Sequence, residues 1–143
     1  MKEYVAQWAL VVFSFFGIAD SAYLAQGELR GILPSCLSGG VNGCQVVAKS
    51  VYAHLFGIPL GIYGLIFYIV VFTIAVWALF MKHAPLKRTL RAVSAIGVFV
   101  SIILFFVQLS LINAFCLYCE ISAVLATFIF VVAWLPEKSD STI

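Results

Sequence analysis

The longest apolar run of this sequence, residues 92–135, constrains the fold more than any other feature. It is about twice as long as the ~20 residues that one helix needs to cross a ~30 Å hydrocarbon core, so the run must break. The break has to occur where polar groups can reach water, because unpaired polar groups are costly in lipid. A cluster of polar and thiol side chains marks the place: Gln108, Ser110, Asn113, Cys116, Cys119 and Glu120. We therefore expect two membrane helices to be joined there.

The composition places the rest of the chain in a membrane as well. Of the 143 residues, 64% are hydrophobic and 10% are charged, which a soluble domain of this size cannot accommodate. The segments long and apolar enough to span a bilayer are residues 4–24, 58–81, 90–111 and 115–135. We expect an all-α membrane protein, with residues 1–143 forming a single four-helix transmembrane bundle surrounded by membrane lipid. The sequence contains no phosphate-binding loop and no nucleic-acid signature, so we expect no nucleic-acid partner.

The positive charges predict how the bundle sits in the membrane. Basic residues gather at one side of the predicted spans: Lys2, Lys82, Lys87, Arg88, Arg91 and Lys138. The remaining segments hold only Arg30 and Lys49. By the positive-inside rule, both termini and the connection between the second and third spans are cytoplasmic. The loop of residues 25–57 and the break near Asn113 then face the periplasm or the extracellular space.

All four cysteines fall on the predicted outer side of the membrane, where disulfides form and persist. Cys36 and Cys44 lie in the outer loop, and Cys116 and Cys119 form a Cys-x-x-Cys pair at the break. Asn113 is a suitable N-cap for the last helix, which would make Cys116 its third residue. Free backbone amides and the positive end of the helix dipole favour a thiolate there. We therefore predict two redox-active pairs.

The outer loop divides into an irregular half and an ordered half. Glycine and proline residues before Cys44 oppose regular structure, so we expect Cys36 to lie in a flexible segment. Beyond Cys44, apolar residues recur at helical spacing and predict a short amphipathic surface helix: Val46, Val47, Val51, Tyr52 and Leu55. Ahead of the loop, Asp20 lies about one turn from the predicted end of the first span, so we expect it to be solvated or capped at the interface.

Small and aromatic residues determine the space inside the bundle. Gly57, Gly61 and Gly64 form a strip that indicates close helix packing or, alternatively, room for a flat ligand. Aromatic side chains nearby can wall a flat ring, although many aromatics of a membrane bundle face lipid: Tyr63, Phe67, Phe105, Phe106 and Phe115.

Two cysteine pairs on one membrane face allow electrons to pass between them by thiol–disulfide exchange. One pair would meet a soluble protein, and the other would deliver electrons to a lipid-soluble two-electron acceptor, which points to a quinone. Cys119 is followed by Glu120 rather than histidine, so the haem-attachment motif is absent. Two other interpretations stay open: a zinc site built from the four cysteines, and two structural disulfides.

The chain resembles the vitamin K epoxide reductase (VKOR) family over nearly its whole length. The order of the cysteines is the most specific part of the resemblance, with two in the first loop and a Cys-x-x-Cys opening the last span. Further matching residues are Gly17, Ser21, Tyr23, Leu24, Ser50, Gly57-Ile58-Pro59 and the stretch 62–68. The match is to prokaryotic-type homologues without a fused thioredoxin-like domain, which implies a thioredoxin-like partner acting in trans.

The resemblance implies a role for each cysteine. Cys119 would face a quinone of the ubiquinone or menaquinone type, and Cys116 would exchange with the loop. Cys44 would attack Cys116, while Cys36 would meet the thioredoxin-like protein. Ser50 would lie near the quinone. Our quinone-site candidates are therefore Ser50, Tyr63, Phe67, Phe115 and Cys119.

The chain departs from the vertebrate members at two positions. Those enzymes hold vitamin K with an asparagine and a tyrosine where this chain has Leu60 and Ala123. We therefore expect a membrane thiol–disulfide oxidoreductase that oxidises a thioredoxin-like partner, reduces a quinone and supports disulfide formation. The alternatives are a reductase of vitamin K quinone or epoxide, and a non-catalytic membrane protein with structural disulfides or a bound metal.

Overall fold

The computed structural model describes residues 2–31, 49–81, 84–113 and 116–135 of the chain. Within these ranges, four helices are long and apolar enough to cross a membrane: α1 (Lys2–Arg30), α3 (Leu60–Phe80), α4 (Ala84–Val107) and α5 (Leu117–Trp134). The expectation of an all-α, four-helix transmembrane bundle is confirmed.

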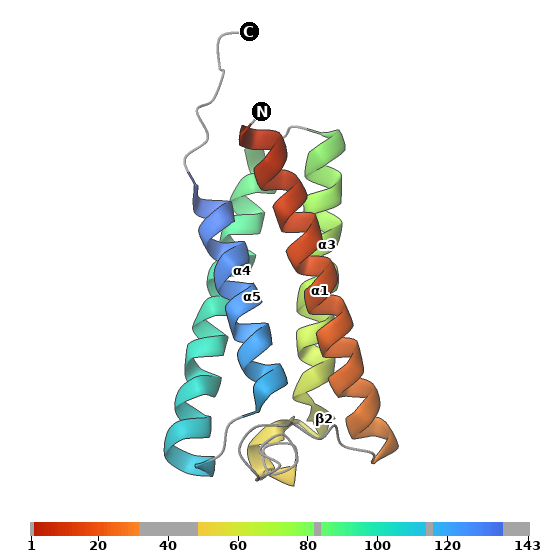
Figure 1. Cartoon of the computed structure of the whole chain (residues 1–143), viewed down its shortest axis with the longest axis vertical. Coiled ribbons are helices and arrows are strands. Elements are labelled where there is room, and N and C mark those ends of the chain that lie inside the picture. Colours follow the sequence, from red (N-terminus) through yellow and green to blue (C-terminus); the bar gives the residue numbers. More distant parts are fainter. Residues whose placement is uncertain (1, 32–48, 82–83, 114–115, 136–143) are drawn as a thin grey trace, which may run out of the picture.

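The four helices form a ring in which each packs on two neighbours (Figure 1). α1 lies between α3 and α5, and α4 closes the ring between the same two helices. The chain runs up and down, so α1 begins and α5 ends at the same end of the bundle. The opposite end carries the α4–α5 junction and a small hairpin, and we call it the hairpin end.

Small side chains fill the contacts between the helices. Ser14 and Ser94 are completely buried, and their hydroxyls donate to carbonyls of their own helices, at 2.7 Å from the oxygen of Leu10 and 2.9 Å from that of Arg91. Large apolar side chains such as Phe99 instead point outwards. Lipid offers such side chains as good an environment as the interior does, so close packing of small residues holds the helices together.

Glycines let α1 and α3 approach each other. A Cβ at Gly61 would lie 2.9 Å from the backbone nitrogen of Ala25, and one at Gly64 would lie 3.1 Å from the hydroxyl of Ser21. A Cβ at Gly17 would fall on the ring of Tyr68. The predicted glycine strip thus serves helix packing at Gly61 and Gly64.

α1 is longer than the sequence suggested. It continues past the predicted end at residue 24 to Arg30, because its last turns pack through buried Ala25 against Gly61 of α3. Asp20 therefore lies ten residues, about 15 Å, before the end of the helix. Its Oδ2 is buried, with no hydrogen-bond partner among the described residues. The expectation that Asp20 is solvated or locally capped at the interface is wrong.

A 3₁₀ turn and a hairpin replace the second half of the predicted surface helix, whereas Lys49 is helical. Val51–Ala53 forms a 3₁₀ turn, and β1 (His54–Leu55) pairs antiparallel with β2 (Ile58–Pro59). The two residues between the strands have φ values of 55° at Phe56 and 78° at Gly57, as a type I′ turn requires. This turn folds the chain back, so a helix through Leu55 is wrong over residues 51–55. Residues 45–48 lie outside the described residues.

Candidate functional site

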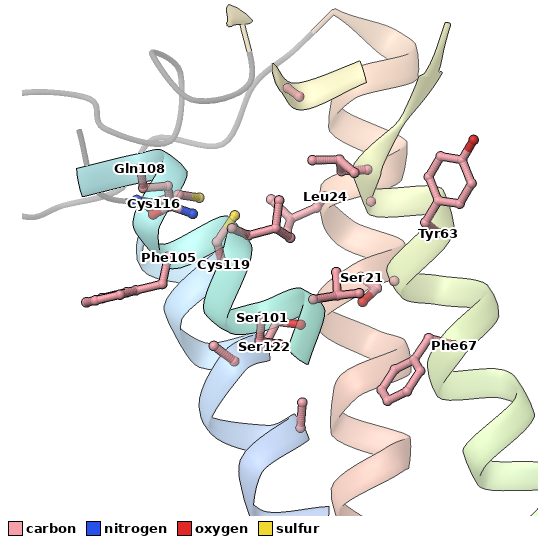
Figure 2. A pocket seen from close by; sticks show the side chains of 18 of the residues that line it. Ser21, Leu24, Tyr63, Phe67, Ser101, Phe105, Gln108, Cys116, Cys119 and Ser122 are labelled. Carbon is pink, nitrogen blue, oxygen red and sulfur yellow. Dashed lines mark hydrogen bonds between the residues drawn. The ribbon is translucent and has the colours of Figure 1, made fainter. Parts of the chain in front are cut away.

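The junction between α4 and α5 is built around a buried glutamine. α4 runs into one turn of π-helix, Gln108–Ile112, which Asn113 closes in the left-handed conformation at φ 55°. The Gln108 side chain is 5% exposed, and its Oε1 accepts a hydrogen bond from the Cys116 backbone N–H at 3.4 Å (Figure 2). The predicted break in the apolar run is confirmed. Asn113, however, ends the turn after α4 and does not cap α5.

Cys116 itself occupies the N-cap of α5. Its backbone is extended, with φ −101° and ψ 118°, and its carbonyl accepts the first helical hydrogen bond from the Glu120 N–H at 3.0 Å. The expectation that Cys116 is the third helical residue is wrong, because Asn113 belongs to the preceding turn. Cys119 becomes the third helical residue instead, so the two cysteines bracket the first turn of α5.

The position of Cys116 determines which sulfur ionises more easily. A hydrogen bond with the Cys119 side chain lowers the pKa of the Cys116 thiol below its ordinary value, and the backbone N–H groups of Cys119 and Tyr118 lower it further. Burial of Cys116 and the charge of Asp20 oppose this shift in pKa. Backbone amides at the start of a helix stabilise a thiolate, which is the reactive form in disulfide exchange. Cys116 is therefore suited to be the exchanging thiolate, with the Cys119 thiol as its hydrogen-bond partner.

Both cysteines line a cavity of about 300 Å³ at the hairpin end of the bundle (Figure 2). All four helices and the 3₁₀ turn contribute to its wall. The wall is mainly apolar, with a few polar side chains placed around it: Ser21, Glu28, Ser101, Gln108, Glu120 and Ser122. An apolar wall with a few polar groups is typical of sites for small organic ligands. A flat ring carrying two carbonyl oxygens fits this character.

Two of the predicted quinone-site residues, Tyr63 and Phe67, line the cavity with different orientations. The Tyr63 hydroxyl donates to the Leu55 carbonyl at 3.0 Å, and Figure 2 shows its ring turned away from the cysteines. Phe67 reaches across to α4, where Gly97 leaves room for its ring. Tyr63 therefore fastens α3 to the hairpin, whereas Phe67 forms part of the cavity wall.

The other predicted residues are placed less favourably or lie outside the described residues. Ser50 is half-buried, and its carbonyl accepts from the Ala53 N–H at 3.1 Å. Ser50 is not among the described residues that line the cavity, although Ala53 is. Phe105 lies on the wall, whereas Phe106 is exposed on the outside of α4. Cys36, Cys44 and Phe115 lie outside the described residues, so the loop pair stays a prediction.

A second layer of the site was not foreseen from the sequence. The Tyr68 hydroxyl donates to the Ser122 carbonyl at 2.6 Å and forms a hydrogen bond with the Ser122 hydroxyl at 2.9 Å, which links α3 to α5 at the cavity. Tyr68 is almost fully buried. Tyr68 ends the stretch 62–68 that resembles the family, but a tyrosine and a serine inside apolar runs are common, so the sequence does not indicate that they pair. Their spacing of 54 residues gives no local signal.

Two positions at which the sequence departs from the resembled vertebrate enzymes also lie at this cavity. Leu60 at the start of α3 and Ala123 on α5 both line it. Neither side chain carries a hydrogen-bond donor, so the wall is apolar at both positions.

Comparisons with known proteins identify the family of the chain. A search among functionally curated proteins finds no match. The model of the vitamin K epoxide reductase family matches residues 8–134, which is most of the 143-residue chain. This multi-pass membrane protein therefore belongs to the vitamin K epoxide reductase family and is an oxidoreductase of that kind.

Proposed function

We propose that this protein oxidises a thioredoxin-like protein and passes the electrons through two cysteine pairs to a quinone, and so supports disulfide formation. One observation carries the proposal: Cys116 and Cys119 bracket the first turn of α5 and both line a cavity enclosed by membrane helices. A dithiol in such a place can exchange with a disulfide at its surface and can also contact a lipid-soluble molecule inside the bundle.

Electrons would move in three exchanges. The dithiol of the partner reduces the Cys36–Cys44 disulfide, and the partner becomes oxidised. The Cys44 thiolate then attacks the Cys116 sulfur of a Cys116–Cys119 disulfide, and Cys36 resolves the mixed disulfide. Cys116 and Cys119 finally form their disulfide again and release two electrons and two protons, which a quinone of the ubiquinone or menaquinone type accepts. Cys119, Phe67 and the apolar wall would hold its ring.

The character of the wall supports disulfide formation over reduction of vitamin K epoxide. Leu60 and Ala123 offer no hydrogen bond to an epoxide or carbonyl oxygen, whereas the vertebrate enzymes have an asparagine and a tyrosine there. A purified preparation should therefore oxidise a reduced thioredoxin-like protein and reduce a ubiquinone or menaquinone analogue. The reaction is measured as the loss of quinone absorbance. Turnover of vitamin K epoxide without turnover of the thioredoxin-like protein and quinone would reverse this assignment.

Trapping of an exchange intermediate tests the relay. In Cys119→Ala, Cys116 loses its resolving partner, so the Cys44–Cys116 bond or a mixed disulfide with the partner should accumulate. Non-reducing electrophoresis and mass spectrometry of the peptides would identify the bond. If Cys116 is recovered only as a thiol under oxidising conditions, the relay through Cys44 is wrong.

The role of Cys36 can be separated from the chemistry at the quinone. Cys36→Ala should abolish oxidation of a thioredoxin-like protein, because that protein docks on the loop pair. Reduction of the quinone by a small dithiol such as dithiothreitol should continue at nearly the original rate, since a small dithiol reaches Cys116 directly. Equal loss with both reductants would remove Cys36 from its shuttle role.

The orientation of the bundle is a further prediction. Basic residues gather near the start of α4, including Lys87, Arg88 and Arg91, so this end should be cytoplasmic. A thiol reagent that cannot cross membranes should then label the reduced protein in intact cells. Labelling of the cysteines only after the cytoplasmic face is opened would reverse the orientation.

A further inference from the structure

Glu28 carries a carboxyl group at the hairpin end of α1. It lies in the last turn of α1, where the negative end of the helix dipole disfavours a carboxylate. Its side chain lines the same cavity as Cys116 and Cys119. Acidic groups within membrane-spanning helices are rare and commonly belong to a functional site.

The surroundings of the Glu28 carboxyl group leave one oxygen available. The carboxyl accepts a hydrogen bond from the backbone N–H of Gly61, at the start of α3, and His54 of β1 interacts with it electrostatically. Its Oε2 is buried and has no hydrogen-bond partner among the described residues. A buried polar atom of this kind requires an explanation, and a ligand in the cavity would supply one. The charges of Asp20 and Glu28 both act on Cys119, but of these two acids only Glu28 is among the described residues that line the cavity.

Resting on the proposed reduction of a quinone, we propose that Glu28 is a catalytic acid that gives a proton to a carbonyl oxygen of the quinone in this cavity. The quinone needs two electrons and two protons to become the quinol. The electrons come from Cys116 and Cys119 as their sulfur–sulfur bond forms. Glu28 supplies one proton and is protonated again by the proton that the Cys119 thiol releases. The other ring oxygen takes a proton from water, which replaces the one that Cys116 released on becoming a thiolate.

Two other carboxyl groups near the site are less suited to this role. Asp20 also has a buried oxygen with no partner among the described residues, but it is not among the described residues that line the cavity. Glu120 does line the cavity, yet among the described residues it is not one with a buried carboxyl oxygen that lacks a hydrogen-bond partner. Asp20 therefore provides a matched control, since it is a second acid of the same helix with a buried oxygen and its charge also acts on the sulfurs, but it does not line the cavity.

The first test is kinetic and uses the full chain, dithiothreitol as the reductant and decylubiquinone as the acceptor. Glu28→Gln keeps the shape of the side chain and removes the acid, so kcat should fall by about a hundredfold, as is usual for loss of a general acid. KM for decylubiquinone should stay within about threefold, because contacts with the ring are kept. Glu28→Asp should recover part of kcat, and Asp20→Asn should stay within about threefold of the original protein.

The second test needs no variant and does not depend on turnover. Dicyclohexylcarbodiimide couples to protonated carboxyl groups in apolar surroundings, and peptide mass spectrometry locates the adduct. In the original protein it should modify Glu28, and decylubiquinone should protect Glu28 from modification. Modification at Asp20, if it occurs, should not respond to decylubiquinone.

The outcomes separate this inference from the proposed function. If the original protein reduces decylubiquinone and Glu28→Gln does so equally well, Glu28 is not the acid while quinone reduction stands. A rise in KM with unchanged kcat would make Glu28 a binding group only. Absence of protection by decylubiquinone would place Glu28 outside the quinone site. Failure of the original protein to reduce any quinone would overturn both the proposed function and the role of Glu28.

Discussion

Replacement of Cys119 by serine is expected to abolish quinone reduction and leave the bundle folded. A serine hydroxyl occupies nearly the same volume but cannot form the sulfur–sulfur bond that releases the two electrons. Loss of a residue that forms the reacting bond typically costs four or more orders of magnitude in kcat, so turnover should fall by roughly 10⁴-fold or to background. The measurement is the rate of decylubiquinone reduction by dithiothreitol, with circular dichroism to verify the helical fold.

The matched variant is Cys116→Ser, which leaves Cys119 as the sulfur on the cavity wall. A thiolate stacked on an electron-poor ring gives a long-wavelength charge-transfer band, so Cys116→Ser with bound quinone should show one. Cys119→Ser should show none. A Cys119→Ser protein that reduces quinone at the original rate would refute the assigned roles.

The largest effect on stability is expected from Gly17→Val. A Cβ at Gly17 would overlap the ring of Tyr68, and Tyr68 cannot move away without losing two hydrogen bonds to Ser122. Overpacking together with strained or broken hydrogen bonds should lower the free energy of unfolding by about 2 to 4 kcal/mol. Thermal unfolding of the purified protein in detergent would record this as a lower Tm.

Ala19→Val is the control for this substitution, because it adds a valine to an exposed position of the same helix. Its Tm should stay close to that of the original protein. If Gly17→Val and Ala19→Val have the same Tm, the close contact of α1 with α3 does not limit stability.

The helices and the place of the cysteine pair follow from local sequence patterns. Long apolar segments determine the four spans, and the polar residues around Cys116 locate the junction between α4 and α5. Both signals are local, because they depend on how a segment partitions between lipid and water. Phe67 lines the cavity, about one turn from Gly64 on α3, and its contact with a quinone stays a prediction.

The features that sequence reasoning missed depend on contacts between distant segments. Cys116 is the N-cap of α5 because the Gln108 side chain accepts a hydrogen bond from its backbone N–H, and because Asn113 ends the preceding π-helical turn. α1 extends to Glu28 and beyond because Ala25 packs against Gly61, which is 36 residues away in the chain. Gly27 favours a loop, so the sequence predicts an earlier end of this helix. The contacts of Cys36 and Cys44 lie outside the described residues and stay predictions.

The ring order of the helices has a consequence for biosynthesis. α5 leaves the ribosome after α1, α3 and α4, and it is also the helix that lies between α1 and α4 and completes the ring. The wall of the cavity is therefore unfinished until α5 has been made, and Cys116 and Cys119 arrive together with that segment. A nascent chain that stalls before α5 has no Cys-x-x-Cys pair to react wrongly with oxidants or other thiols. Redox competence and completion of the fold are thus acquired in a single step of insertion.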